Sequence, residues 1–366
     1  MREGVPIPVN SNERKTDMKV VDMHCDTISA LLKARRKGEE VSLRKNPFHL
    51  DLEKMSIGDY LLQNFALFVE MEACQDPWLE VQVLLDLYEE EMQANADWIL
   101  PVLSTADIKK NREQGKMSAM LTVEEGGVCG GNLDKLKILY KQGVRMMTLS
   151  WNYPNELGYP NLDREKGKAV RLAAKSLEAL KADEMVKAYL NTPNTEKGLT
   201  ETGRTFVTCM EELGMIIDVS HMSDAGFYDV LACTKKPFVA SHSNARSICP
   251  CVRNLSDDMI RKLAERGGVT GLNFCADFLT QLPVGVHNPG TIEAVVSHAK
   301  YITNLGGMEC LGLGSDFDGI DTHEELPGAD CMERLWNALK KGGFKERELD
   351  KIYSENVLRV YQEVLK

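Results

Sequence analysis

Short apolar runs recur along the chain, and amphipathic segments with a helical period separate most of them. The runs lie at about residues 19–25, 64–71, 118–124, 145–151, 215–220, 238–242, 268–274 and 311–315. The clearest amphipathic segments are 77–94, 132–142, 200–213, 256–266 and 291–305, the last with Thr291 near its cap. Continuous apolar strands that alternate with such helices are typical of a parallel sheet covered on both faces. Eight such units predict an α/β fold, a (β/α)₈ barrel.

An open, doubly wound sheet is the alternative to the barrel. A glycine-rich phosphate-binding turn after an early strand would favour it, and the sequence contains no good turn of that kind. The barrel therefore stays the first prediction.

Residues 151–200 contain no clear strand. They include two turn-rich stretches with asparagine and proline, followed by a polar helical segment from Arg164 to Tyr189. We expect an enlarged loop after the fourth strand, forming a lid or rim where barrels carry substrate contacts. We therefore predict one barrel domain over residues 19–366, preceded by a flexible segment over residues 1–18.

The composition excludes several classes of partner. The net charge of −11 argues against nucleic acid, whose phosphates attract clustered lysine and arginine. No run approaches the roughly 20 apolar residues of a membrane span, and residues 1–17 have no apolar core of a signal peptide. Ten scattered cysteines, Cys249 and Cys251 included, fit structural thiols in a reducing compartment. We predict a cytoplasmic protein without a nucleic-acid or membrane partner.

Histidines and acids gather where five of the apolar runs end. Because barrel strand ends converge on one mouth, these side chains are expected to meet there. Imidazole and carboxylate groups are common zinc ligands. The residues are His24, Asp26, Glu124, Glu125, His221, His242 and Asp316.

Separate roles can be suggested for members of this set. A glutamate at the end of the third strand could bridge two metal ions. His24 and Asp26 would then hold one ion, and His221 and His242 the other. Asp316 could take a proton from metal-bound water and pass it to a leaving amine. Arg253, after the sixth strand, could hold a substrate carboxylate through two hydrogen bonds. The remaining histidines are not predicted to be ligands: His49, His287, His298 and His323.

The residues in combination resemble the membrane dipeptidase (renal dipeptidase) family, the M19 zinc peptidases, and its soluble bacterial branch. The similarity runs from about residue 19 to residue 365. Its motifs are Asp22-Met-His24-Cys-Asp26, Glu124-Glu125-Gly-Gly, Gly198-Leu-Thr200-Glu-Thr-Gly203, Ile217-Asp-Val-Ser-His221-Met-Ser-Asp224, Ser241-His242-Ser-Asn-Ala245, Arg253-Asn-Leu-Ser-Asp257 and Gly314-Ser-Asp316-Phe-Asp-Gly319.

The resemblance implies an amidohydrolase-type barrel with two zinc ions that hydrolyses dipeptides to free amino acids through a bridging hydroxide. It implies that His24 and Asp26 hold one ion and that His221 and His242 hold the other. A third-strand glutamate would bridge them. Asp316 would shuttle the proton, and Arg253 would bind the C-terminal carboxylate of the dipeptide. The resemblance also suggests a homodimer.

Two positions depart from the better-known members or align in two ways. The bridging glutamate is either Glu124 or Glu125, and we favour Glu124 because an extra residue fits more easily after a strand than inside it. Many members have a histidine near the end of the fourth strand, where this chain has Trp151 and Asn152. We predict that both contact substrate, Asn152 by donating a hydrogen bond to the developing oxyanion.

Two other hypotheses compete with a dipeptidase. The same barrel could act on another small amide or on a lactone, which would make Arg253 dispensable. It could also be a binding module that has lost catalysis, although the full set of ligand types and Asp316 argue against that.

Overall fold

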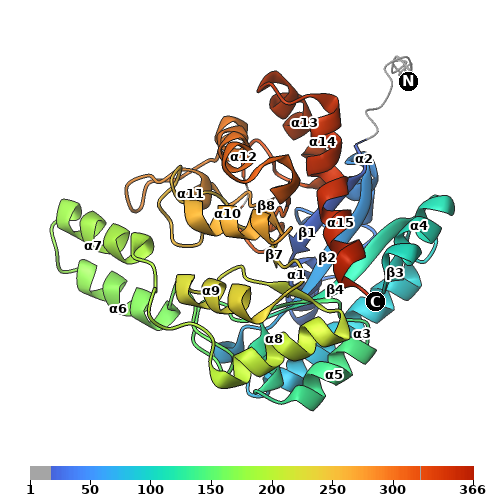
Figure 1. Ribbon diagram of the computed structural model, residues 1–366, viewed down its shortest axis with the longest axis horizontal. Helices are drawn as coiled ribbons and strands as arrows, with labels where there is room; N and C mark the ends of the chain where they lie inside the picture. Colours follow the sequence, from blue (N-terminus) through green and yellow to red (C-terminus); the bar gives the residue numbers. More distant parts are fainter. Residues whose placement is uncertain (1–17, 322) are drawn as a thin grey trace, which may run out of the picture.

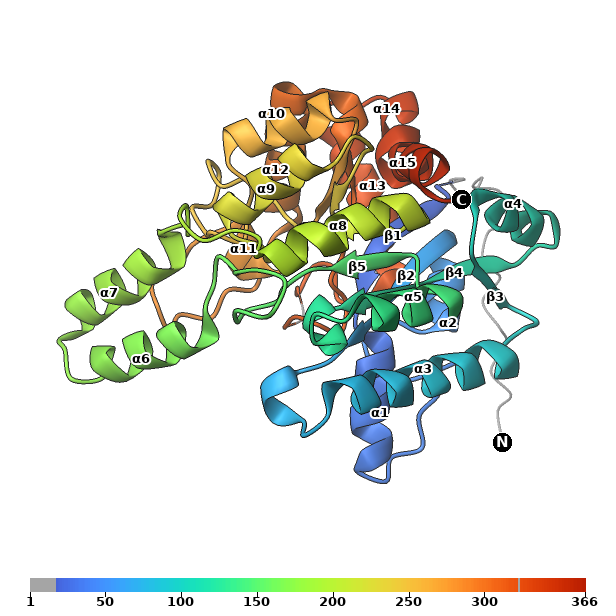
Figure 2. The same ribbon diagram turned by 60° about the horizontal axis from the view of Figure 1, so that its bottom comes forward.

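The computed structural model describes residues 18–321 and 323–366, and eight of its parallel strands close into a barrel (Figures 1 and 2). The predicted flexible segment 1–18 therefore lies outside the described residues, except for Met18. The strands are β1 (Val20–Cys25), β2 (Tyr60–Phe68), β3 (Ile99–Val102), β4 (Met117–Glu124), β5 (Met146–Thr148), β6 (Ile216–Asp218), β7 (Val239–Ala240), β8 (Val269–Leu272) and β9 (Leu311–Leu313).

The pairing of β2 with β4 closes the barrel. The sheet runs in the order β2-β1-β9-β8-β7-β6-β5-β4, and the ladder from Leu62–Ser118 to Phe68–Glu124 joins its two ends. Every strand pair is parallel. The predicted α/β barrel is confirmed.

Strand β3 was not predicted. It pairs with the first half of β4, from Met117 to Met120, while β5 pairs with the second half on the same side. It has only four residues, and Pro101 removes one backbone donor, so it lacks the signature of a barrel strand.

The predicted runs 145–151 and 238–242 are longer than the strands that form. Strand β5 ends at Thr148 and β7 at Ala240, and the residues that follow leave the ladder. Leu149, Ser150, Ser241 and His242 are buried in the turns at the barrel mouth, so burial-compatible residues alone could not mark the strand ends.

The described helices surround the barrel. The five clearest predicted segments form within one residue of the expected bounds, and the predicted segment from Arg164 to Tyr189 forms as two helices. The described helices are α1 (Thr27–Arg36), α2 (Leu52–Ile57), α3 (Pro77–Ala94), α4 (Thr105–Glu113), α5 (Leu133–Lys141), α6 (Arg164–Ala174), α7 (Ala179–Asn191), α8 (Glu201–Leu213), α9 (Asp224–Cys233), α10 (Asp257–Glu265), α11 (Ala276–Leu279), α12 (Ile292–Gly306), α13 (Met332–Lys341), α14 (Glu346–Asp350) and α15 (Asn356–Val364). Thr291 caps α12 as predicted, since its Oγ1 accepts a hydrogen bond from the amide of Ala294 at 3.2 Å. Across the described residues, every helix is too short or too polar to cross a bilayer.

Helix α15 closes the amino-terminal end of the barrel. Its Val357, Val360 and Val364 belong to one buried cluster with the first residues of several strands, among them Met146 and Ile216. Because one end is packed shut in this way, the carboxyl ends of the strands are left to carry a site.

The connection from β5 to β6 contains α6 and α7, which project from the barrel as a pair (Figures 1 and 2). The hydroxyl of Tyr189 donates to the carbonyl of Asp163 at 2.6 Å, joining the two helices at their base. Asn191 exchanges hydrogen bonds with Gln281 beyond α11. The long β5–β6 connection is thus tied to a second loop at the same end of the barrel.

Candidate active site

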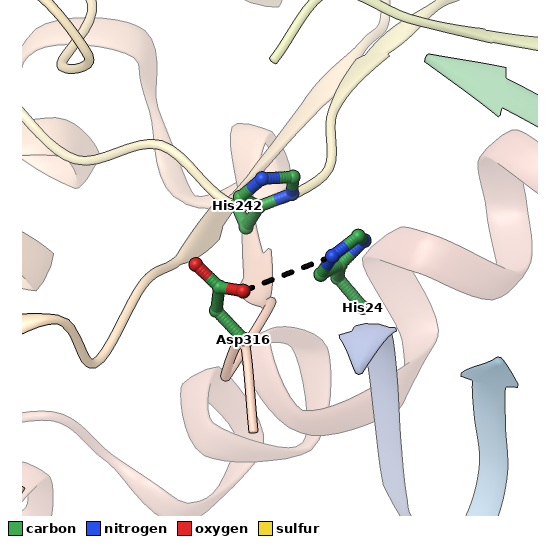
Figure 3. A group of neighbouring side chains, drawn as sticks. All are labelled: His24, His242 and Asp316. Atoms are coloured by element: carbon green, nitrogen blue, oxygen red, sulfur yellow. Dashed lines mark ion pairs between the residues drawn. The ribbon is translucent and has the colours of Figure 1, made fainter. Parts of the chain in front are cut away.

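The ring of His24, at the end of β1, lies against three carboxylates. Its Nε2 is 3.1 Å from Glu124 Oε2, 3.4 Å from Asp26 Oδ2 and 3.7 Å from Asp316 Oδ1. Figure 3 shows His24, His242 and Asp316 pointing toward one another from three separate segments. The convergence predicted for β1, β4 and β9 is present.

The rings of His221 and His242 meet on the other side of Glu124. Their Nε2 atoms are 3.0 Å apart, and His221 Nε2 is 3.0 Å from Glu124 Oε1. Glu124 thus presents one oxygen to His24 and the other to the histidine pair. This arrangement suits a carboxylate that bridges two metal ions.

Glu125 faces away from the cluster. Its Oε2 accepts hydrogen bonds from the amide of Trp151 at 3.0 Å and from Nδ2 of Asn155 at 3.3 Å. Burial raises the pKa of Glu125 to about 8. Of the two adjacent glutamates, the geometry supports Glu124 as the ligand.

Buried polar atoms without a partner fit a metal centre here. Among the described residues, neither ring nitrogen of His24 makes a hydrogen bond, and the same holds for Asp26 Oδ1 and Glu124 Oε1. Leaving such atoms unpaired is costly, and a metal ion would satisfy them. Three groups of ligand atoms lie close enough to hold an ion, and two share Glu124. The imidazole and carboxylate donors suit zinc.

The three histidines of the cluster differ in protonation. Burial lowers the pKa of His221 to about 4 and holds that of His242 well below 6.5, so both rings are neutral with a lone pair available. Burial also opposes charge on His24, but the carboxylates of Glu124 and Asp26 outweigh it and hold its pKa well above 6.5. A metal ion held by His24 would therefore take the place of a proton.

A buried aspartate fixes the ring of His242. Asp218, at the end of β6, accepts from the hydroxyls of Thr148 at 2.7 Å and Ser241 at 2.5 Å. Since its hydroxyl proton goes to Asp218, Ser241 accepts from His242 Nδ1 at 2.7 Å. The proton of His242 is thereby placed on Nδ1, and the Nε2 lone pair faces the cluster.

Asp22 of β1 makes a similar contact with the turn after β9. It accepts from the amide of Ser315 at 2.9 Å and from its hydroxyl at 2.5 Å. This contact holds the turn that carries Asp316. His221 and Asp316 both have left-handed backbone angles, with φ of 70° and 64°, so their turns depend on such support.

Asp316 is buried at the cluster with one oxygen held in place. Its Oδ2 accepts from Nδ2 of Asn273 at 2.9 Å, while Oδ1 faces His24. Burial raises the pKa of Asp316 to about 7, with His24 opposing the shift and Asp26 adding to it. Such a carboxyl group can both accept and donate a proton near neutral pH.

Asn152 and Trp151 line the same mouth. Asn152 Oδ1 is 2.9 Å from His221 Nδ1, so the asparagine orients a predicted metal ligand. The ring centroid of Trp151 lies 4.9 Å from that of Phe68 and 6.1 Å from that of His221. The predicted contact of Asn152 with an oxyanion stays a prediction.

Arg253 is buried, and its hydrogen bonds are long. Its guanidinium nitrogens lie 3.4 Å from Ser243 Oγ and 3.4 Å from the carbonyl of His242. Its Nε has no hydrogen bond with any described residue, and its guanidinium carbon lies 5.4 Å from the centroid of the Phe278 ring. A buried cation with unmet donors beside the cluster is suited to a carboxylate ligand.

A cavity of about 180 Å³ opens over this cluster. Its walls combine the acids of the cluster with aromatic and aliphatic side chains and one lysine. The lining residues are Asp26, Ser29, Ala30, Lys33, Phe68, Glu124, Trp151, Asn152, His221, Phe278, Asp316, Asp318, Gly319 and Ile320. Its size suits a small molecule.

A comparison with sequence models of known families identifies the family of this chain. The sequence model of the family described as membrane dipeptidase (peptidase family M19) matches residues 11–180 and 168–366. The chain belongs to this family.

Two individual relatives are similar to this chain over most of its length. An uncharacterized protein in the pqqA 5′ region of Klebsiella pneumoniae is 33% identical over 263 residues, 72% of this chain and 88% of that protein. The dipeptidase tcpJ of Claviceps purpurea is 27% identical over 287 residues, 76% of this chain and 59% of that protein.

Solved structures show the same fold. A metallopeptidase of family M19, dipeptidase AC, has a TM-score of 0.82 at 24% identity, over 95% of this chain and 99% of that one. A metallopeptidase from Rhodobacter sphaeroides, liganded with a phosphinate mimic of the dipeptide L-Ala-D-Ala, has a TM-score of 0.81 at 24% identity and the same coverage.

Four residues that hydrogen-bond to the predicted ligands, to Asp316 or to their turns were not predicted as site residues. They are Asp22, Asp218, Ser241 and Asn273. The available signal was a buried acid inside an otherwise apolar strand, as at Asp22 and Asp218, which are both 0% exposed. A polar residue in such a place needs partners, and here the partners are the turns that carry the ligands.

The four histidines not predicted as ligands lie outside the groups of described side chains that could hold a metal ion. His298 has a structural role, because Nδ1 accepts from the amide of Ala245 at 3.1 Å and Nε2 donates to the carbonyl of Leu279 at 3.0 Å. His49 accepts from the amide of Asp318 at 3.1 Å and helps to hold the turn after β9.

Proposed function

We propose that this M19 family member is a binuclear zinc dipeptidase that hydrolyses dipeptides to free amino acids. The observation that carries the proposal is the position of Glu124, whose two carboxylate oxygens face two separate groups of ligand atoms. His24 and Asp26 would hold one ion, and His221 and His242 would hold the other. The ions, when bound, would supply a bridging hydroxide at neutral pH and polarise the scissile carbonyl.

The residues of the chain position the substrate and move the proton. Arg253 would bind the C-terminal carboxylate with its unmet donors, which places the peptide bond over Glu124. Asp316 would accept the proton of the attacking water and deliver it to the departing amine, since its raised pKa permits both states near pH 7. Trp151 and Phe68 would form the aromatic wall that limits the space for the substrate.

A substrate panel tests this proposal. The zinc-loaded protein is assayed with L-X–L-X and L-X–D-X dipeptides, with the matching C-terminal amides and with simple lactones. We expect hydrolysis of dipeptides and much slower hydrolysis of the amides, which lack the carboxylate for Arg253. Activity on lactones or amides that equals or exceeds activity on every dipeptide would contradict the proposal.

A further inference from the structure

One face of helix α1 lines the cavity over the cluster. Asp26, Ser29, Ala30 and Lys33 all border that cavity. Their spacing of three, one and three residues places them on one stripe of a helix. Helix α1 begins at Thr27 beside the metal cluster, so Lys33 lies nearly two turns further out, on the rim.

Lys33 also lies where two cavities meet. A second cavity of about 360 Å³ shares Ser29, Lys33 and Phe68 with the cavity over the cluster. The Nζ of Lys33 is 5.8 Å from the centroid of the Phe68 ring. An extended side chain that leaves the cluster along α1 therefore passes this ammonium group.

Two carboxylates that line the second cavity with Lys33 are already paired with other cations. Glu80 forms an ion pair with Arg36 at 2.6 Å, and Glu70 pairs with Arg164. Lys33 itself forms no ion pair with any residue that the structure describes. Asp26, on the same face of α1, lies within range of the Lys33 charge but forms no ion pair with it, so the ammonium group can still pair with a carboxylate from outside the chain.

Two cations, Arg253 and Lys33, lie at opposite ends of the candidate site. Arg253 lies beside His242 and Ser243, on the side of β7. Lys33 lies beyond Asp26, on the side of β1. If a dipeptide places its C-terminal carboxylate at Arg253 and its peptide bond over Glu124, its amino-terminal residue extends toward α1.

We infer that Lys33 selects dipeptides whose amino-terminal residue is aspartate or glutamate. The side-chain carboxylate pairs with the Lys33 ammonium, and its methylene groups pack against Phe68. This inference rests on the proposed dipeptidase function. It adds to that function a preference for dipeptides with a negatively charged amino-terminal side chain.

An isosteric pair of substrates tests the inference. The kcat/KM values for Glu-Ala and Gln-Ala are compared in the zinc-loaded wild type and in Lys33→Met. We expect the wild type to favour Glu-Ala by about fivefold, the range of an exposed ion pair, and the preference to shrink in high salt. In Lys33→Met the ratio should fall to about one.

Lys37→Met is the matched control, because Lys37 lies one helical turn further from the cluster along the same face. It should keep the wild-type ratio. Charge reversal in Lys33→Glu should invert the ratio. Equal kcat/KM for Glu-Ala and Gln-Ala in the wild type would overturn the role of Lys33 and leave the dipeptidase function intact. Absence of hydrolysis of any dipeptide would overturn both.

Discussion

At the scale of single residues, two of the five predicted ligands, His221 and His242, are oriented by neighbouring side chains that are not predicted ligands themselves. Ser241 and Asp218 place the proton of His242 on Nδ1. Asn152 does the same for His221. Both Nε2 atoms then face Glu124 with a lone pair. Such partners raise the affinity of a histidine for metal because they hold the ring and its tautomer in advance.

Asn152 is therefore expected to act through His221. Replacing it in Asn152→Ala removes the acceptor for Nδ1 and should weaken zinc binding by about 10-fold to 100-fold. In Asn152→Asp an acceptor remains, so affinity should stay near that of the wild type. Competition with a chelator of known affinity measures both variants. An alanine variant that binds zinc as tightly as the wild type would exclude this role.

Asp316 is expected to move protons without being needed for metal retention. Asp316→Asn keeps the shape of the side chain, so two zinc ions should still bind. Because the amide cannot take up a proton, kcat should fall by about 10²-fold to 10⁴-fold. Metal analysis and steady-state kinetics on the same preparation separate these effects. Loss of zinc from the variant would mean that Asp316 is a ligand instead.

At the scale of elements, the short strands and the turns after them shape the site. Strands β6 and β7 have three and two residues, and each is followed by a turn that carries a histidine. The turn after β7 is held by Asp218 of β6, through the amide of Ser241 at 2.8 Å. Adjacent elements thus fix one another. His221 and His242 are carried by hydrogen-bonded turns, whereas His24 and Glu124 belong to β1 and β4.

The cap of helix α12 was predicted from the local sequence and can be tested directly. Thr291→Ala removes the side-chain acceptor for the amide of Ala294 and should lower the free energy of unfolding by about 1 kcal/mol. Ser297→Ala on the exposed face of the same helix is the control and should change it by less than about 0.5 kcal/mol. Urea denaturation measures both. Equal effects of the two changes would argue against the cap.

The sequence pattern predicted elements that are strongly periodic and missed those that depend on partners. Helix α3 was expected over 77–94 and forms there. Its apolar stripe identifies the buried face, and Pro77 identifies the first turn of the helix. Strand β3 could not be found because its four residues gain order only from pairing with β4. The end of β5 was placed too late because buried turn residues resemble strand residues.

At the scale of the whole molecule, closure of the barrel brings the site together. His24 and Asp316 are far apart in sequence, yet β1 pairs directly with β9. This convergence was predictable from the barrel, because parallel strand ends share one mouth. The contacts of Asp22 and Asp218 were not, because they depend on which strands are neighbours and on how each turn bends.

The sequence alone could not decide whether Glu124 or Glu125 faces the other predicted ligands. Both follow the same apolar run, and both are buried. Only the three-dimensional arrangement turns one toward His24 and His221 and the other toward Trp151 and Asn155.

We propose above that two metal ions, bridged by Glu124, support dipeptide hydrolysis. A titration of the metal-free protein with zinc, with dipeptide hydrolysis followed at each addition, tests it most directly. We predict that activity is absent at the start and reaches its plateau at two zinc ions per chain. A plateau at one ion per chain, or full activity before any zinc is added, would exclude a binuclear zinc centre as the source of activity.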